Sequence, residues 1–277
     1  MFSKKSFFRV SKPGYRDHAN PNRSVYRHAH AKKRQAVMEP YTDLAASYDY
    51  ILGHVNYDEW YRYLRTLMCQ YIENPRLILE LGCGTGKFGA KFSRDDFPIY
   101  GMDKSIEMLS VAKARAFKDF HIFCGDMMNF HLTKKFDFVF SVHDTMNYFL
   151  RYVDLRKVFK SVRRVVRDDG VFMFDVTTEY NIQRFFNNKR MQYRFRGTDI
   201  VWTNTYNPKA RIVVSTLTFT KRGITSVEHH YQRIYSVREI RDLLEKEKFK
   251  VIDIFGDYTF SPPTSDTVMI NFITRKL

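Results

Sequence analysis

The segment RLILELGCGTGKF, residues 76–88, constrains this chain more than any other. An apolar run at positions 77, 78, 79 and 81 has the length of a strand buried on both faces. Glycines at positions 82, 84 and 86 follow it, and a helix can begin at Lys87. A strand, a glycine turn and a helix form the βα unit that presents the amino end of a helix to a ligand. Glycines suit such a turn because they have no Cβ to hold the backbone away from that ligand.

The glycine spacing and two acidic residues narrow the class of ligand. G-x-G-x-G followed by Lys87 does not meet the dinucleotide pattern G-x-G-x-x-G. Glu80, at the mouth of the loop, would repel a pyrophosphate but would suit an ammonium or sulfonium group. Asp103 ends the next predicted strand, where a carboxylate can accept hydrogen bonds from both hydroxyls of a ribose. A nucleoside ligand with a cationic substituent is indicated, and an ordinary βα turn is the alternative.

Strand and helix patterns alternate between residues 76 and 175, as a doubly wound parallel sheet requires. Strands are predicted at 77–81, 98–102, 120–124, 136–141 and 170–175, and helices at 86–93, 105–117 and 153–167. The ligand crevice of such a sheet lies at the carboxyl ends of its strands. Residues at those ends are Gly82, Asp103, Asp126 and Ser141.

The segments on either side of this alternation have different patterns. Residues 36–74 are predicted to form two helices, the second opening near Asp58, which could cap it, and ending before Pro75. Residues 177–235 predict an antiparallel insertion with strands at 192–196, 200–206, 211–221 and 226–236. Residues 236–277 supply a helix at 237–247 and two last strands of the core, at 251–255 and 268–273.

The positive charge is concentrated at the amino end. The chain has a net charge of +16, and residues 1–35 hold ten Lys or Arg and one acid, a net of +9. These residues are predicted to be a flexible basic arm. Nucleic-acid binding by this arm, a solvated tail and an organelle transit peptide all stay open as interpretations.

The cysteines and the apolar runs bear on the compartment. The three cysteines, at positions 69, 83 and 124, form no C-x-x-C pair, so neither a disulfide framework nor a zinc site is indicated, and we expect no metal. A reducing compartment fits this pattern, and no apolar run reaches the length of a membrane span. A cytoplasmic location is therefore expected, while the oligomeric state is open.

Four motifs in order resemble those of the class I S-adenosylmethionine-dependent methyltransferases. ELGCGTG (80–86) is similar to the first motif, GMDKSIEML (101–109) to the second, CGDMMNF (124–130) to the third and FDFVFSVHDTMNY (136–148) to the fourth. The resemblance spans roughly residues 40–180 and returns near the carboxyl terminus. It implies an α/β fold with a doubly wound, mostly parallel seven-stranded sheet (Rossmann-like), and a SAM-binding core at 36–176 that carries 177–235 as an antiparallel β lid.

The resemblance also implies which residues bind the cofactor S-adenosylmethionine (SAM). Glu80 and the loop would hold the methionine end, Asp103 the ribose and Asp126 the adenine, with Met127 and Ile106 stacking on the adenine. Tyr41 and Tyr48 would touch the methionine part, or be ordinary core tyrosines. The implied cofactor residues are Tyr41, Tyr48, Glu80, Gly82, Cys83, Gly84, Gly86, Asp103, Lys104, Asp126, Met127 and Ser141.

Methyl transfer from a sulfonium requires an oriented nucleophile, exclusion of water and removal of any proton on that nucleophile. His143, Asp144 and Asn147 follow the fourth strand, where the methyl group is expected. SVHD stands in place of Asn/Asp-Pro-Pro-Tyr/Phe, which argues against methylation of the amino groups of adenine or glutamine. A polar strand exit without chemistry is the alternative.

A second candidate set lies in SVEHHYQRIYS, residues 226–236. On a strand, Glu228 and His230 share one face, while Arg233 lies on the other. This stretch resembles a strand of small-molecule methyltransferases whose inserted sheet covers the active site, and an exposed charge pattern is the alternative. The catalytic candidates are therefore His143, Asp144 and His230, and the candidates for substrate binding are Asn147, Tyr148, Glu228 and Arg233.

The resulting hypothesis is a SAM-dependent methyltransferase that acts on a small molecule. An RNA or protein methyltransferase that uses residues 1–35 is the first alternative, suggested by the sequence pI of about 9.7. A non-catalytic RNA-binding protein on the same fold is the second alternative.

Overall fold

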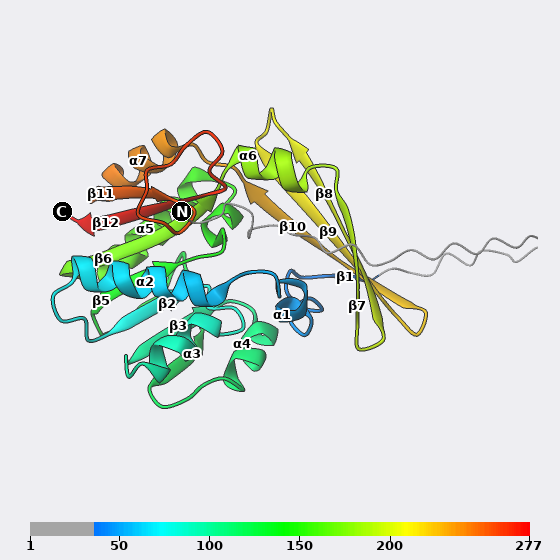
Figure 1. The fold of residues 1–277 in the computed structure, drawn as a ribbon, viewed down its shortest axis with the longest axis horizontal. Coiled ribbons are helices and arrows are strands. Elements are labelled where there is room, and N and C mark those ends of the chain that lie inside the picture. Colours follow the sequence, from blue (N-terminus) through cyan, green and yellow to red (C-terminus); the bar gives the residue numbers. More distant parts are fainter. Residues whose placement is uncertain (1–35) are drawn as a thin grey trace, which may run out of the picture.

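The computed structural model describes residues 36–277, and the predicted basic arm at 1–35 lies outside the described residues. A seven-stranded sheet forms the core, in the order β11-β12-β6-β5-β2-β3-β4 (Figure 1). Its strands run parallel except β12, which pairs antiparallel with both β6 and β11. The strands are β2 (Ile78–Leu81), β3 (Ile99–Asp103), β4 (Phe120–Cys124), β5 (Phe136–Ser141), β6 (Val166–Thr177), β11 (Phe249–Gly256) and β12 (Met269–Lys276). The predicted fold class is confirmed.

Helices cover both faces of this sheet, because its central strands are apolar on both sides. On one face, α2 and α3 pack their aromatic and aliphatic side chains against Phe138 and Phe140. On the other face, α5 and α7 pack against Phe172 and Phe174. The helices are α2 (Tyr57–Tyr71), α3 (Lys87–Arg94), α4 (Ile106–Lys113), α5 (Tyr152–Val165) and α7 (Val237–Lys246).

The ring of Phe120 fits into a notch made by three glycines. A Cβ built on Gly89 would lie 2.2 Å from this ring, one on Gly101 2.8 Å and one on Gly86 3.1 Å. The ring is buried, so it has no open space into which it could move. The glycines therefore let β3, β4 and the start of α3 approach one another closely.

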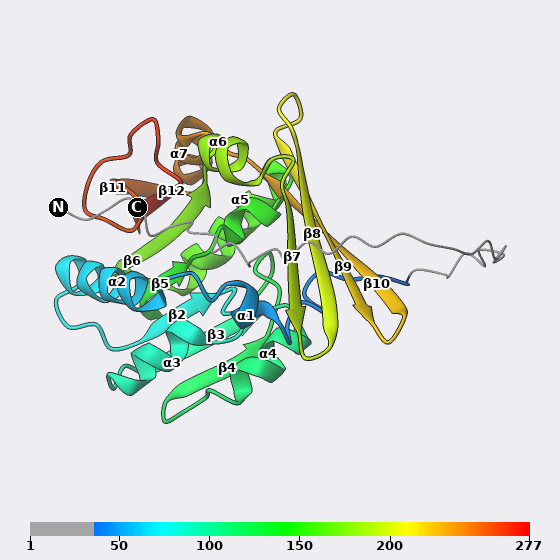
Figure 2. The same cartoon turned by 45° about the vertical axis from the view of Figure 1, so that its right-hand side comes forward.

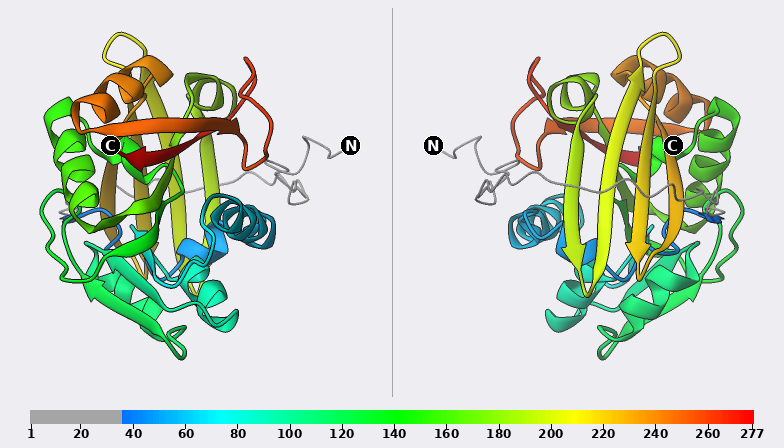
Figure 3. Two further views of the ribbon diagram at one scale, coloured as in Figure 1. Left: turned by 90° about the vertical axis from the view of Figure 1, so that its left-hand side faces the viewer. Right: turned by 90° about the vertical axis from the view of Figure 1, so that its right-hand side faces the viewer.

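A second, antiparallel sheet lies beside the carboxyl ends of the core strands (Figure 2). Its order is β1-β10-β9-β8-β7, and one face is directed toward the core while the other has no helix of residues 36–277 in front of it (Figure 3). The four predicted strands of the insertion are present, with turns at Gly197 and Gly223. The strands are β1 (Ala36–Met38), β7 (Arg190–Phe195), β8 (Thr198–Asn207), β9 (Ile212–Lys221) and β10 (Ile224–Arg233).

The prediction of helices throughout residues 36–74 was partly wrong. Ala36–Met38 is the strand β1, which pairs parallel with β10, and the first helix, α1, is only Tyr48–Ile51. Tyr41 has a φ of 68°, which an α-helix cannot accommodate. Asn56 rather than Asp58 caps α2, since its side chain accepts a hydrogen bond from the Glu59 N–H at 3.2 Å.

Three other boundaries differ from those predicted. The insertion begins with the helical turns α6 (Glu179–Asn181) and η3 (Ile182–Phe186), which the sequence pattern did not indicate. β6 begins at Val166, four residues before the predicted start at 170, with a register shift between Phe136 and Phe138 of β5. α4 ends at Lys113, four residues before the predicted end.

We expect Gly89→Ala to destabilise the protein, although alanine normally favours a helix by about 1 kcal/mol over glycine. Overpacking against the Phe120 ring costs about 1–3 kcal/mol, so the free energy of unfolding should fall by about 1 kcal/mol. Urea denaturation measures the change. The same substitution in a Phe120→Leu background is the control and should lose most of its penalty. Stabilisation by Gly89→Ala in the native background would contradict the notch.

Candidate active site

The glycine loop between β2 and α3 lies where three strands end. Gly82 and Gly84 have φ values of 71° and 53°, in the left-handed region that favours glycine. A Cβ on Gly82 would lie 2.8 Å from Thr145, which follows β5, and 3.0 Å from Met127, which follows β4. Any larger residue at position 82 would therefore disrupt the place where these loops meet.

Glu80 is a buried acid with an unsatisfied oxygen. Its side chain is only 1% exposed, and Oε2 has no hydrogen-bond partner among residues 36–277. Burial raises the pKa of this carboxyl well above its usual value, and the nearby Asp103 adds to the rise. A cationic group bound beside Oε2 would offset the cost of burying this acid. The site thus fits the ammonium or sulfonium group that the sequence indicated.

Asp103 ends β3 and binds the glycine loop. Its Oδ2 accepts the Gly84 N–H at 2.8 Å, and its Oδ1 accepts the Ser105 N–H at 2.9 Å. Ser105 in turn caps α4, accepting the Met108 N–H at 3.1 Å. Each carboxylate oxygen can accept more than one hydrogen bond, so Asp103 can still bind ribose hydroxyls. Burial raises the pKa of Asp103.

Three of the implied cofactor residues support the glycine loop through contacts with the core. The thiol of Cys83 is buried against Gly101, and burial raises its pKa. The hydroxyl of Ser141 donates to the Leu81 carbonyl at 2.8 Å. Gly86 precedes α3 with a φ of 76° and packs near Ala112. The side chains of Cys83 and Ser141 and the backbone of Gly86 therefore hold the loop in place rather than face a ligand.

The remaining implied cofactor residues lie after β3 and β4. Asp126 accepts the Met128 N–H on Oδ1 at 2.9 Å, which holds the turn after β4. Met127 is half-buried beside Gly82, whereas Lys104 and Ile106 are exposed. Asp126 and Met127 are therefore at the carboxyl edge of the sheet, where the adenine was expected.

The segment around α1 lies against the glycine loop. Asp49 accepts a hydrogen bond from the Thr85 hydroxyl at 2.8 Å and forms ion pairs with Arg115 and, at 3.6 Å, with Lys87. Tyr48 and Tyr41 pack edge to face with their ring centroids 6.0 Å apart. Both tyrosines are thus held between the loop and the antiparallel sheet. No pattern in the sequence indicated a role for Asp49.

Four side chains form a continuous hydrogen-bonded chain. Glu228 Oε2 lies 3.0 Å from His230 Nε2, and His230 Nδ1 lies 3.0 Å from the hydroxyl of Tyr148. The hydroxyl of Tyr41 donates to that of Tyr148 at 2.6 Å. Burial raises the pKa of both tyrosines, so they remain protonated. Glu228 and His230 are 0% and 3% exposed, so the alternative of an exposed charge pattern does not apply to them.

Asp144 and His143 follow β5 on a strained turn, with φ values of 49° and 64°. Their N–H groups donate to the two oxygens of Asp175, at 2.7 and 2.8 Å. Burial raises the pKa of Asp144 to about 7, and the nearby Gln232 amide offsets part of that rise. Asp144 can therefore exchange a proton near neutral pH.

His143 is placed for packing rather than for proton transfer. Its ring stacks on Tyr57 with centroids 5.5 Å apart and lies 4.7 Å from that of Trp60. Burial lowers its pKa to about 3, so the ring stays neutral and is a poor base. The geometry does not support the catalytic role that the sequence suggested.

The side chains of two further candidates, Asn147 and Arg233, also make contacts within the protein. The Asn147 side chain donates to the Arg233 carbonyl at 2.7 Å and accepts the Thr177 N–H at 3.0 Å, so it ties three segments together. The Arg233 guanidinium lies over the Tyr152 ring, 4.4 Å from its centroid, and pairs with Glu239. Both side chains therefore support the structure, and their contact with a substrate stays a prediction.

Asp175 is a further residue of this site that the sequence analysis did not predict. It is wholly buried at the carboxyl end of β6 and accepts a hydrogen bond from Tyr258 as well as from the 143–144 turn. An acid at the end of a buried strand was the signal that singled out Asp103. The same reasoning applied to the predicted strand at 170–175 would have found it.

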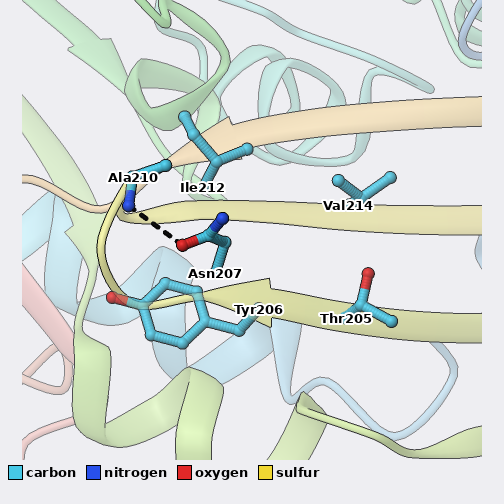
Figure 4. Close-up of a pocket in the computed structure, with 6 residues that line it drawn as sticks. All are labelled: Thr205, Tyr206, Asn207, Ala210, Ile212 and Val214. Carbon is cyan, nitrogen blue, oxygen red and sulfur yellow. Dashed lines mark hydrogen bonds between the residues drawn. The ribbon is translucent and has the colours of Figure 1, made fainter.

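A surface hollow lies away from these groups. It has a volume of about 360 Å³ and is lined by Thr205, Tyr206, Asn207, Ala210, Ile212 and Val214, around the β8–β9 turn (Figure 4). None of its residues belongs to the loops that carry Glu80, Asp103 or Asp144. In residues 36–277, no helix has the length and apolar character needed to cross a bilayer, and no three His, Cys, Asp or Glu side chains gather as metal ligands.

Known proteins share this sequence and this fold. Residues 78–170 match the family described as "Methyltransferase domain". A protein of Geobacillus sp. (strain WCH70), provisionally named a methyltransferase, is 26% identical over 245 residues, which cover 85% of this chain and 99% of that one. A S-adenosylmethionine-dependent methyltransferase from Clostridium acetobutylicum is 25% identical, with a TM-score of 0.73 over 85% of this chain and 98% of that one. A sugar N-methyltransferase from Streptoalloteichus sp. is 15% identical, with a TM-score of 0.66 over 94% and 100% of the two chains.

Fold and site together define an enzyme that binds a nucleoside cofactor at the carboxyl edge of a doubly wound sheet. With the comparisons, the chain is identified as a class I S-adenosylmethionine-dependent methyltransferase. The resemblance seen in the four sequence motifs is confirmed, and SAM is its cofactor.

We expect Asp103→Ala to weaken SAM binding by about 10- to 100-fold, because it removes charge-assisted hydrogen bonds worth about 1.5–3 kcal/mol. Calorimetric titration with SAM measures the change, and circular dichroism checks the fold. Asp119→Ala, an exposed acid just before β4, is the matched control and should bind normally. Unchanged affinity in the Asp103 variant would contradict the assignment of the ribose site.

Proposed function

We propose that this methyltransferase acts on a small molecule held between the carboxyl edge of the core sheet and the antiparallel sheet. The observation that carries this proposal is the burial of Glu228 and His230, which are almost inaccessible to solvent. Both groups belong to the hydrogen-bonded series that runs from Glu228 through His230 and Tyr148 to Tyr41, beside the cofactor loops. Because the antiparallel sheet covers these groups, we expect the acceptor to be a small molecule rather than a folded RNA or protein.

The proposed division of the chain follows from this arrangement. Residues 39–176 and 236–277 form the cofactor-binding core, and 177–235, together with the β1 strand paired to β10, form the lid over the acceptor. The structurally similar sugar N-methyltransferase, which acts on a small acceptor by its name, supports this interpretation. The RNA alternative rests on residues 1–35, outside the described part of the chain, and the non-catalytic alternative is set aside because the chain is a methyltransferase.

The residues divide the work of methyl transfer. SAM supplies an electrophilic methyl group on a sulfonium. Glu80 and the glycine loop bind the methionine end, Asp103 the ribose, and Asp126 with Met127 the adenine. Asp144 takes the proton of the acceptor nucleophile, since its pKa lies near neutral. Tyr148, held by His230, orients that nucleophile. The antiparallel sheet above the acceptor excludes water.

Methyl transfer to fractionated cell extract tests this function. The full chain is incubated with SAM carrying a tritiated methyl group and either the dialysable or the macromolecular fraction. We expect label in the dialysable fraction only, and none with Asp103→Ala. Label confined to RNA or to protein would overturn the small-molecule proposal, while the chain would still be a methyltransferase.

The rate should depend on the ionisation of Asp144. An acid with a raised pKa is protonated below that pKa and becomes a base above it, so kcat should rise as the pH passes about 7. Asp144→Asn should lower kcat by about 100-fold or more and remove this rising limb. Asp242→Asn, the same change on an exposed residue of α7, should leave the profile unchanged. If kcat still rises with pH in Asp144→Asn but no longer rises in His230→Gln, the proton acceptor is His230 instead.

A further inference from the structure

Three polar side chains form a row across the inner face of the antiparallel sheet. Asn204 of β8 pairs with Ser215 of β9, and Ser215 pairs with His230 of β10. All three are buried. We call Asn204, Ser215 and His230 the polar band.

The polar band separates two apolar contacts of the same face. On one side, Leu217 and Ile200 pack against Leu44 and Ile51 of the amino-terminal segment. On the other side, Val213 packs with Ile182 of η3 and with Ile234. A polar row between two apolar contacts adds no hydrophobic stabilisation to the interface, so its polar groups call for another explanation.

Asn204 has a hydrogen-bond donor with no partner. Its Oδ1 accepts from the Trp202 indole N–H at 2.8 Å and from the Ser215 hydroxyl at 2.5 Å. Because the indole N–H can only donate, the amide orientation is fixed, and Nδ2 must point elsewhere. Nδ2 is buried without a partner among the described residues, and Asn204 is 2% exposed. A buried amide left unsatisfied is costly, which indicates that something binds it.

The polar band is continuous with the proposed catalytic groups. His230 contacts the Tyr148 hydroxyl, and Gln232, two residues further along β10, lies beside Asp144. Neighbouring strands are about 4.8 Å apart, so Asn204 lies roughly 10 Å from His230 across the sheet. One small molecule can therefore reach from Tyr148 to Asn204.

The charges of the inner face restrict what that molecule can be. Among the inner positions of β7, β8, β9 and β10, Lys221 is the one Lys or Arg, and it is exposed at the end of β9, three pairs beyond Ser215. The acids at and next to the polar band are Glu228 and Asp144. Phosphates and carboxylates are normally bound by Arg or Lys. A polar band that contains neither disfavours an anionic acceptor and suits a neutral or cationic one.

We propose that Asn204 determines acceptor specificity, donating its free amide N–H to an oxygen of a polyhydroxylated or amino-hydroxylated small molecule that has no acidic group. This inference rests on the proposed function, because it places the acceptor beneath the same sheet. The amide oxygen of Asn204 is engaged by Trp202 and Ser215, so the residue presents donors only. It therefore selects acceptors by an oxygen distant from the methylated atom.

Four probes of one ring size test the class of acceptor. Glucosamine, glucose, glucuronate and glucose 6-phosphate are titrated calorimetrically into the full chain loaded with S-adenosylhomocysteine. We expect glucosamine and glucose to bind, and the two acids to bind at least tenfold more weakly. Equal binding of all four, stronger binding of the acids, or no binding of any probe would overturn the proposal.

Variants at position 204 test the residue itself. Asn204→Asp keeps the oxygen that accepts from Trp202 and Ser215 but removes the donor, and should weaken glucosamine binding about tenfold. Asn204→Ser, which introduces no charge, should do the same if Asn204→Asp fails to fold. Asn188→Asp is the control, because Asn188 is exposed in the turn before β7. Equal effects of the variants at 204 and 188 would overturn the role of Asn204.

SAM binding separates this inference from the proposed function. Every variant at position 204 should bind SAM with the affinity of the native chain, because Asn204 lies on the lid and not on the cofactor loops. Normal SAM binding with methyl transfer confined to macromolecules would defeat the proposed function. Small-molecule methylation that is indifferent to Asn204 would defeat only this inference.

Discussion

The carboxylate of Glu228 is the interaction on which the rest of the site depends. Its two oxygens accept the N–H groups of Tyr41, Asp43 and Leu44, at 2.5 to 3.0 Å, and Oε2 also contacts His230. A fully buried carboxylate is tolerated only when such partners satisfy it. This single side chain therefore turns the amino-terminal segment back over the core, docks it on β10 and fixes the imidazole that holds Tyr148.

The second constraint is the convergence of strand ends. Glu80, Asp103, Asp144 and Asp175 all lie at or just beyond the carboxyl ends of neighbouring core strands. Burial raises the pKa of each of these acids. So many buried acids would be unfavourable without hydrogen-bond donors and cationic ligands nearby. The backbone N–H groups of the loops donate some of the hydrogen bonds that these acids need. The positive charge of the bound sulfonium cofactor would stabilise them further.

The core sheet and its cofactor loop were largely predictable from the sequence. The ends of all seven core strands fall within four residues of the predicted ends, because buried parallel strands give continuous apolar runs bounded by turns. The amino-terminal segment was not predictable in this way. Tyr41, Leu44 and Tyr48 have helical spacing, but the buried carboxylate of Glu228 captures the local N–H groups and prevents a helix. Such a contact joins residues more than 180 positions apart and leaves no local pattern.

The class of fold, the cofactor and the acids expected to bind it could be inferred from the sequence, since glycine spacing and strand-end acids are local features with local physical causes. The roles of the remaining candidates depend on how distant segments of the chain pack against one another. His143 and Asn147 had the composition of active-site residues, but packing placed one against aromatic rings and satisfied the other with backbone bonds. Asn204 had no sequence signal at all, because its meaning lies in an unsatisfied N–H that exists only once three strands are paired.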